Sequence, residues 1–348
     1  MKAIVVSPEK YREEAISLAE SADYKVLKII NIPKRRDPNF YLNRKILDDL
    51  NKEEFDSLII FDLLKPRHFT NLQKIFINKK ILDKVLLLLE VFSLHSSSIE
   101  AKLQIELARV KYELPILKDM YKKTKIGEQQ GPLGSGAYGV TSIVRLYQNK
   151  IKRIINELEE IKKSRETQIM KNNQIPSIAI VGYTNVGKTS LFNALTGLKR
   201  AVDTKMFTTT IPKRYSITVN GKKLMLVDTV GFIRGIPPQI IEAFFVTLSE
   251  TKYANGIILM VDISYPQDLF IESIESSFKI LRDIGVSGKP LLVVANKIDK
   301  INGNINSKME FLSEIIKKYY EPVIDIIPVS VKFNINVDKV RDSLYLLV

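Results

Sequence analysis

The sequence predicts a mixed α/β protein in three parts: a parallel α/β domain at residues 1–95, a helical hairpin linker at 96–174, and a mostly parallel α/β domain at 175–348. Three observations lead to this prediction. Short apolar runs alternate with helical patterns near the start, and two apolar stripes flank a glycine-rich segment in the middle. After residue 176 an apolar run leads into a phosphate-loop motif. A chain of 348 residues has room for this organisation.

Composition excludes several classes of protein. Apolar residues make up 45% of the chain and charged residues 26%, which excludes a mostly disordered protein. Without cysteine the chain has no disulfides, thiolate metal sites or thiol catalysis. A net charge of +14 favours a polyanionic partner. No signal peptide or apolar run long enough for a membrane span is evident, so we expect a cytoplasmic monomer without a membrane partner.

The first 95 residues alternate between two patterns, as in a parallel sheet flanked by helices. Nothing there resembles a glycine-rich phosphate loop. The basic triplet Lys34-Arg35-Arg36 has the chemistry to touch phosphate, although a solvated loop is the more common fate of such a run. We expect strands at residues 3–6, 24–30, 58–61 and 85–91, and helices at 12–21, 44–51 and 71–78.

The middle of the chain predicts two antiparallel helices. Apolar residues step by four and three from Leu103 to Leu117, and again from Val140 to Ile161, so each stripe is expected to bury the other. Pro115 predicts a kink or break in the first helix. The glycine-rich loop 127–139 is either a plain connector or a probe for a partner. Residues 96–177 hold 15 Lys and Arg against 9 Asp and Glu, which fits either a surface for nucleic-acid backbone or a solvated helical face.

The chemistry lies in the last segment, where an apolar run at 177–181 leads into a G-x-x-x-x-G-K-[ST] phosphate loop. Its glycines let backbone N–H groups point at a phosphate, and the following helix adds its positive end. Lys188 is expected to bridge the β- and γ-phosphates, and Thr189 to ligate Mg²⁺. The loop and the start of its helix comprise Gly182, Tyr183, Thr184, Asn185, Val186, Gly187, Lys188, Thr189 and Ser190.

A second motif follows a predicted β-hairpin with Asn220-Gly221 at its turn. Asp228 ends the second strand and is placed to hold the Mg²⁺ shell through water, while Gly231 offers its N–H to the γ-phosphate. Phe232 directly follows Gly231, at the position where Ras-like GTPases usually carry a glutamine that orients the attacking water. Because a phenylalanine side chain neither donates nor accepts a hydrogen bond, we expect slow intrinsic hydrolysis. Lys188, Gly231 and a switch threonine form the predicted catalytic set.

Two further motifs predict guanine rather than adenine. Asp299 offers two acceptor oxygens that match the N1–H and N2 donors of guanine, a donor pair that adenine lacks. Backbone N–H groups near Ser330 suit the guanine O6. The two motifs comprise Asn296, Lys297 and Asp299, then Ser330, Val331 and Lys332. With the phosphate loop and the Asp228 motif in order, they identify a GTPase with GTP as substrate and GDP as product.

A threonine run lies between the first two motifs, and one of its members is expected to close over Mg²⁺ and the γ-phosphate. Spacing alone does not say which one. The run comprises Phe207, Thr208, Thr209 and Thr210.

These residues resemble the HflX GTPases of the translation-factor-related class. The resemblance rests on the phosphate loop and on three further stretches, residues 100–108, 164–168 and 228–244. It implies an α/β domain, a helical linker and a GTPase domain that acts on the ribosome, mainly its large subunit. It also implies that Thr209 is the Mg²⁺ ligand of the threonine run. Asn185 falls where some related GTPases place a K⁺ ligand; equal GTP turnover in K⁺ and Na⁺ buffers would exclude this role.

The sequence also departs from the family pattern. The loop at 127–139 lacks the family's R-G-P-G-E-type motif, and Val331 and Ile211 replace the usual Ala and Asp. Three functions remain open: a GTPase that binds ribosomes through the basic hairpin 96–177, a large-subunit assembly factor that binds immature rRNA, and a signalling switch that binds only proteins.

Overall fold

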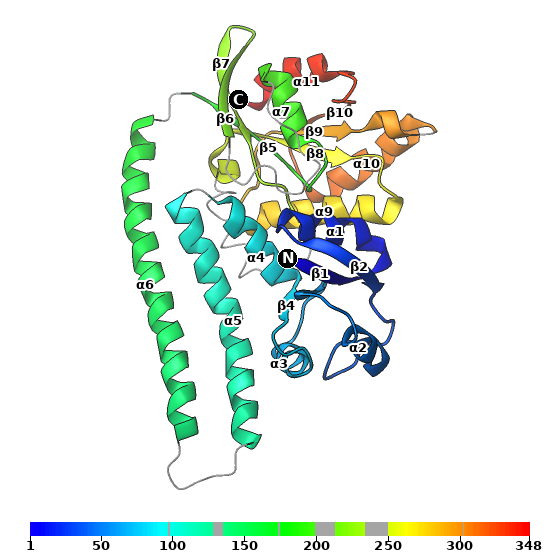
Figure 1. The fold of residues 1–348 in the computed structure, drawn as a ribbon. Coiled ribbons are helices and arrows are strands. Elements are labelled where there is room, and N and C mark those ends of the chain that lie inside the picture. Colours follow the sequence, from blue (N-terminus) through cyan, green and yellow to red (C-terminus); the bar gives the residue numbers. More distant parts are fainter. Residues whose placement is uncertain (97, 128–134, 173–174, 199–212, 234–249, 302) are drawn as a thin grey trace. The chain divides into compact units, whose positions relative to one another are not determined.

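The helices and strands of the computed structural model fall into two units, Met1–Lys163 and Ser164–Val348 (Figure 1). The structure describes the whole chain except residues 97, 128–134, 173–174, 199–212, 234–249 and 302. Among the described residues, no helix is long and apolar enough to cross a membrane. The predicted α/β class is confirmed, since each unit contains a largely parallel sheet with helices packed on it.

The first unit is built on a four-stranded parallel sheet of order β2-β1-β3-β4. The central strand β1, which pairs with β2 and β3, is apolar and buried from Ala3 to Val6, as a strand with neighbours on both sides requires. The elements of this unit are β1 (Lys2–Ser7), α1 (Arg12–Ser21), β2 (Lys25–Asn31), α2 (Arg44–Leu50), β3 (Ser57–Ile60), α3 (Pro66–Ile75), β4 (Lys80–Asp83), α4 (Lys84–His95), α5 (Ile99–Gly127) and α6 (Ser135–Asn172) up to Lys163, the last residues of α6 being counted with the second unit.

The strand expected at 85–91 is wrong, because these residues form helix α4. The fourth strand is instead β4, just before it. Asp83 caps the helix by accepting a hydrogen bond from the Leu86 N–H at 2.9 Å. Residues 84–92 are all buried, since α4 lies between α1, α5 and the strands β3 and β4. A helix buried on every side reads as a continuous apolar run, which periodicity alone does not distinguish from a buried strand.

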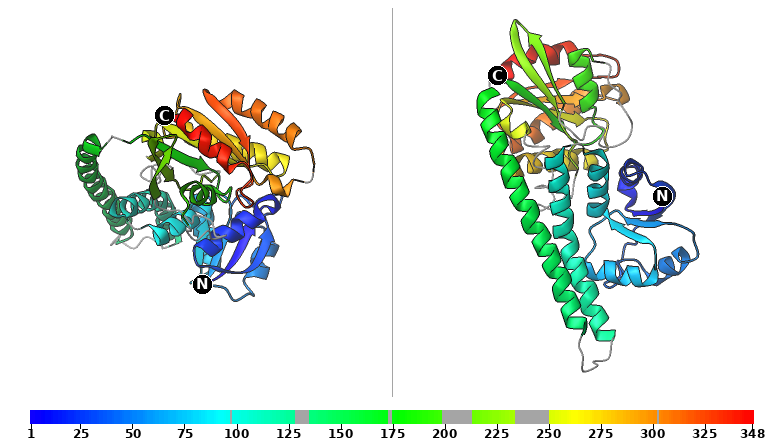
Figure 2. Two further views of the ribbon diagram at one scale, coloured as in Figure 1. Left: turned by 90° about the horizontal axis from the view of Figure 1, so that it is seen from above. Right: turned by 60° about the vertical axis from the view of Figure 1, so that its left-hand side comes forward.

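Helices α5 and α6 run side by side in both views (Figures 1 and 2), and Lys150 of α6 pairs with Glu106 of α5 at 2.7 Å. Helix α5 is continuous through Pro115. Residues 135–139, expected in the loop, belong to the first turns of α6. Glycine is tolerated there because the first amides of a helix need no partner within it.

Helix α5 buries a different face from the one expected. It packs against α3 and α4, and its buried residues include Ala101, Ile105, Ala108 and Ile116. Most of the stripe that begins at Leu103 is only half-buried. The helix therefore has two apolar faces, and the one that contacts the α/β layer is the more deeply buried.

Polar contacts also fasten α5 to this layer. The Tyr112 hydroxyl donates to the buried carboxylate of Asp83, and Thr70 of α3 donates to Asp119 at 2.8 Å. Burial raises the pKa of Asp83 to about 6, although the N–H of Leu86 and the Tyr112 hydroxyl act in the opposite direction.

The second unit is built on a six-stranded sheet of order β10-β9-β8-β5-β7-β6, parallel except for the β6–β7 hairpin. Asn220 and Gly221 both have positive φ, 49° and 76°, as the predicted type I′ turn requires. Helices α9 and α10 pack together, as do α7 and α11. The elements are β5 (Ser177–Gly182), α7 (Lys188–Thr196), β6 (Lys213–Val219), β7 (Lys222–Asp228), β8 (Gly256–Asp262), α9 (Gln267–Asp283), β9 (Leu291–Asn296), α10 (Ile305–Tyr319), β10 (Val323–Pro328) and α11 (Val337–Ser343).

Replacing Tyr112 by Phe tests how α5 is fastened. We expect the free energy of unfolding to fall by about 1 to 3 kcal/mol at pH 7, because a buried carboxylate loses a donor. The raised pKa means that the folded state binds a proton on Asp83 more tightly than the unfolded state does. Protonated Asp83 therefore adds to the free energy of unfolding at pH values below its unfolded pKa, and this contribution is lost as pH rises through about 6. The loss in Tyr112→Phe should therefore be larger at pH 7 than at pH 5. Urea unfolding measures both, with exposed Tyr253→Phe as the control; an equal loss at the two pH values would contradict this explanation.

Candidate nucleotide-binding site

The predicted site residues of the phosphate loop lie where β5 ends and α7 begins, as expected from the motif. Gly182 has φ 144°, and a Cβ atom there would lie 2.3 Å from the Met260 carbonyl oxygen. Asn185 and Gly187 also have positive φ, 63° and 100°. Gly187 is the N-cap of α7, so the loop turns directly onto the amino end of the helix. This geometry leaves backbone N–H groups at a helix end that favours an anion.

Lys188 is buried and donates to the Tyr183 carbonyl at 2.6 Å. Burial, and to a smaller extent the charge of Lys297, lowers the pKa of Lys188 to about 8, although the carboxylate of Asp228 acts in the opposite direction. A phosphate arriving at the loop would reverse much of this shift, because it would supply the negative charge that the buried ammonium favours.

Thr189 and Asp228 meet at the start of α7 and the end of β7. The Thr189 hydroxyl donates to Asp228 Oδ2 at 2.9 Å, and both side chains are buried. A hydroxyl and a carboxylate side by side are oxygen donors of the kind that Mg²⁺ prefers. The described residues contain no group of three His, Asp or Glu side chains arranged to hold a metal.

The segment after Asp228 is hydrogen-bonded to the phosphate loop through its backbone. Phe232 N–H donates to the Gly182 carbonyl at 2.9 Å, and Thr184 N–H donates to the Phe232 carbonyl at 2.8 Å. The Phe232 side chain is buried, so it packs into the interior of the unit. Gly231 lies close to the loop, since a Cβ atom there would be 2.9 Å from Lys188 Nζ and 2.7 Å from Thr184 Cγ2.

The two predicted guanine motifs come together at the carboxyl ends of β9 and β10. Ser330 donates to Asp299 Oδ1 at 2.6 Å, which orients the carboxylate expected to read guanine. Asn296 joins three loops: its Nδ2 donates to the Val186 carbonyl at 2.8 Å, and its Oδ1 accepts from the Val331 N–H at 3.1 Å. Lys332 lies over the Phe333 ring, 5.1 Å from its centroid.

Lys297 connects this end of the site to the phosphate loop. Its ammonium donates to the Asn185 carbonyl at 2.8 Å and pairs with Asp262 Oδ2 at 2.6 Å. Sequence reasoning missed Asp262. An aspartate directly after the apolar run 257–261 was the available signal, the same one that identified Asp228.

Four predicted site residues, Phe207, Thr208, Thr209 and Thr210, lie outside the described residues.

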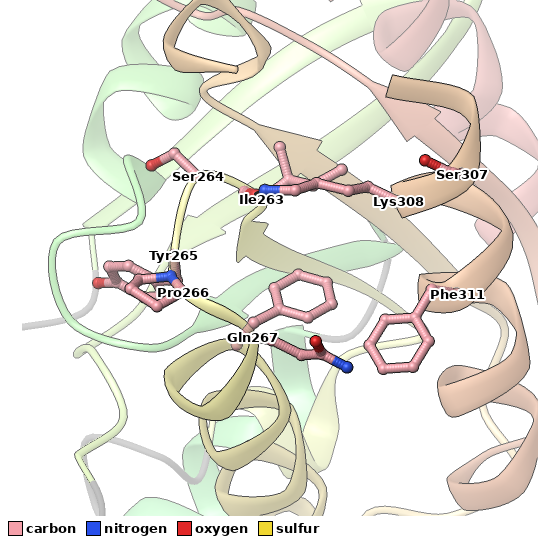
Figure 3. A pocket seen from close by; sticks show the side chains of 9 residues that line it. Ile263, Ser264, Tyr265, Pro266, Gln267, Ser307, Lys308 and Phe311 are labelled. Atoms are coloured by element: carbon pink, nitrogen blue, oxygen red, sulfur yellow. Dashed lines mark hydrogen bonds between the residues drawn. The ribbon is translucent and has the colours of Figure 1, made fainter. Parts of the chain in front are cut away.

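A separate cavity of about 430 Å³ is found between the loop after β8 and helix α10 (Figure 3). Its wall includes Ser264 and the rings of Phe270 and Phe311, whose centroids are 6.3 Å apart. Lys308 reaches across it to the Ile263 carbonyl at 3.0 Å.

Three family models match the chain in order. They are described as GTP-binding GTPase N-terminal at residues 9–93, GTP-binding GTPase middle region at 95–172, and 50S ribosome-binding GTPase at 177–297. Similar proteins include the GTPase HflX of Saccharolobus solfataricus, 56% identical over 99% of this chain and 98% of that protein. The GTPase HflX of Caldanaerobacter subterraneus is 37% identical over 85% of this chain and 71% of that protein.

Solved structures that resemble the chain over its length include two that contain GDP. The crystal structure of a protein named SsGBP with GDP is 48% identical, with a TM-score of 0.65, and the match covers 99% of this chain and 98% of that one. A GTP-binding protein from Sulfolobus solfataricus in complex with GDP is 47% identical over the same shares, with a TM-score of 0.60.

The lowered pKa of Lys188 predicts an unusual pH dependence of GDP binding. The protonated form that attracts phosphate is lost as pH rises through about 8, so affinity should fall about fourfold between pH 7 and pH 8.5. Calorimetric titration with GDP across this range measures the change. Arginine stays charged throughout, so Lys188→Arg should bind with little pH dependence here. The same slope in both proteins would assign the titration to another group.

Proposed function

The chain belongs to the HflX family of GTPases, and from this premise we propose that its nucleotide state controls its association with the large ribosomal subunit. It is a GTP-hydrolysing enzyme that binds guanine nucleotides. We further propose that its intrinsic hydrolysis is slow, that its partner is the ribosome and that it is cytoplasmic. The roles of individual residues given below are also proposals.

Each loop of the site has a proposed task. The phosphate loop and Lys188 bind the phosphates, while Asp299 reads guanine with its carboxylate held by Ser330. Thr189 and Asp228 would hold Mg²⁺, which neutralises phosphate charge when bound. Gly231 would offer its N–H to the γ-phosphate, because nothing larger than hydrogen fits against Lys188 there. We propose Thr209 as the residue that closes this arrangement.

Slow hydrolysis follows from Phe232. A buried aromatic ring neither accepts nor donates a hydrogen bond to water, and the backbone of Phe232 is already paired with the phosphate loop. Positioning of the attacking water is a large part of catalysis in phosphoryl transfer. We therefore propose that a partner, or a rearrangement of this segment, supplies it.

The observation that supports a ribosomal RNA partner is a polar face of α6. Arg145, Asn149, Lys152 and Asn156 are exposed and follow a helical step of four and three, so they share one face of the helix. The opposite side includes Ile154, which is fully buried. A straight, basic helical face suits the phosphate backbone of RNA, because its cations displace condensed counterions.

Sedimentation with purified large subunits under GDP, GTP and a non-hydrolysable analogue tests the proposal. We expect binding to depend on the nucleotide, and GTP turnover by the protein alone to stay below about 1 s⁻¹. Binding to immature particles alone would favour the assembly function, and no nucleotide-dependent binding would remove the ribosomal one.

Reversing Arg145 and Lys152 to Glu tests the surface itself. We expect at least tenfold weaker binding near 100 mM salt, and a slope of log affinity against log salt shallower by about 1 to 2 units. The control is Lys317→Glu with Lys318→Glu on α10, which changes net charge equally at exposed positions. GDP affinity should be the same in both variants; equal loss of ribosome binding in both would show that only net charge matters.

A further inference from the structure

Asp262 is a buried carboxylate at the carboxyl end of β8, one strand away from the predicted guanine motif. It is 1% exposed and lies opposite Asn296 in the β8–β9 register. Its two oxygens have separate partners. Oδ2 pairs with the Lys297 ammonium at 2.6 Å, whereas Oδ1 accepts from the Ser264 N–H at 3.0 Å and its hydroxyl at 2.6 Å.

Lys297 has an unusual backbone conformation. Its φ of 68° is in the left-handed region, which a residue with a long side chain adopts only under constraint. From there its ammonium reaches the Asn185 carbonyl at 2.8 Å. The four-carbon stem therefore spans the distance between the motif that contains Asp299 and the phosphate loop.

We propose that Asp262 is a positioning residue for the guanine nucleotide: it anchors the Lys297 ammonium so that the lysine stem forms a fixed wall between the base and phosphate ends of the site. This inference rests on the proposed site, in which Asp299 reads the base. A flexible ammonium side chain loses much rotamer freedom when ordered, and a buried, charge-assisted pair fixes it before the nucleotide arrives.

The pair also moderates the charge of the site. Lys297 carries a cation whose field reaches Lys188 and lowers the pKa of Lys188. Asp262 places a carboxylate directly on that cation. The phosphate loop thus keeps one buried ammonium for phosphate, with the second neutralised next to it.

The two oxygens of Asp262 allow its positioning role to be separated from turn capping. Asp262→Asn keeps an acceptor for Ser264 but removes the carboxylate charge that pairs with Lys297, whereas Ser264→Ala removes the turn cap and leaves the ion pair. We expect Asp262→Asn to weaken GDP binding by about 10- to 100-fold, which is the range for losing a hydrogen bond to a charged group. Ser264→Ala should change it by less than about threefold.

A double-mutant cycle with Lys297→Met gives the decisive measurement by calorimetric titration with GDP. When the lysine is absent, Asp262→Asn should cost no further affinity, because its effect passes through Lys297. Lys297→Met removes the cation but leaves Asp262 Oδ1 with its two donors from Ser264, and the double variant carries no charge at position 262. These two variants can therefore be compared even if Asp262→Asn alone is too unstable to purify. Equal loss in both backgrounds, or equal effects of Asp262→Asn and Ser264→Ala, would overturn the inference.

Inosine diphosphate, which lacks the N2 amino group, separates this inference from the proposed site. Asp262→Asn should weaken GDP and inosine diphosphate equally, because Asp262 does not touch the base edge. Asp299→Asn should instead erase the preference for GDP over inosine diphosphate. No effect of Asp299→Asn on this preference would refute the proposed guanine site, whereas unequal effects of Asp262→Asn on the two nucleotides would refute only the positioning role.

Discussion

The side-chain amide of Asn296 is the contact on which the arrangement of the site depends. Three loops leave the carboxyl ends of β5, β9 and β10, and each is a separate segment with its own freedom. Asn296 is the last residue of β9, and its amide donates to the Val186 carbonyl in the loop after β5 and accepts from the Val331 N–H in the loop after β10. Because an amide has both a donor and an acceptor, no single-function side chain could replace it here. The phosphate loop and the loop after β10 are thereby held at a fixed distance from each other.

Close packing around two glycines brings the phosphate loop against β8 and against the segment that follows Asp228. Gly182 passes against the Met260 carbonyl, and Gly231 lies against Thr184 and Lys188. The segment at Phe232 then pairs with the edge of the phosphate loop through two backbone hydrogen bonds. The loop has little free volume here, so a side chain at position 231 would displace Thr184 or Lys188.

Helix α4 could not be predicted from its local sequence pattern. Its apolar run was expected to be a strand, since a fully buried element has no polar face to reveal its period. The deciding features were the cap at Asp83 and the enclosure by α1, α5 and the sheet. Helix α5 makes the same point, because its deeper face packs on the α/β layer and not along the stripe expected to be buried.

The sequence alone determined the order and chemistry of the nucleotide motifs, because each consists of a short segment whose function depends on residue type and spacing. Gly187, Lys188 and Thr189 are recognisable at once for that reason. Only the tertiary structure decided that Asn296 ties the loops together and that Asp262 holds Lys297, because these contacts join strand ends and loops that follow different strands. Their partners are far apart along the chain, or on a neighbouring strand, and a strand's own pattern does not specify which strand lies beside it.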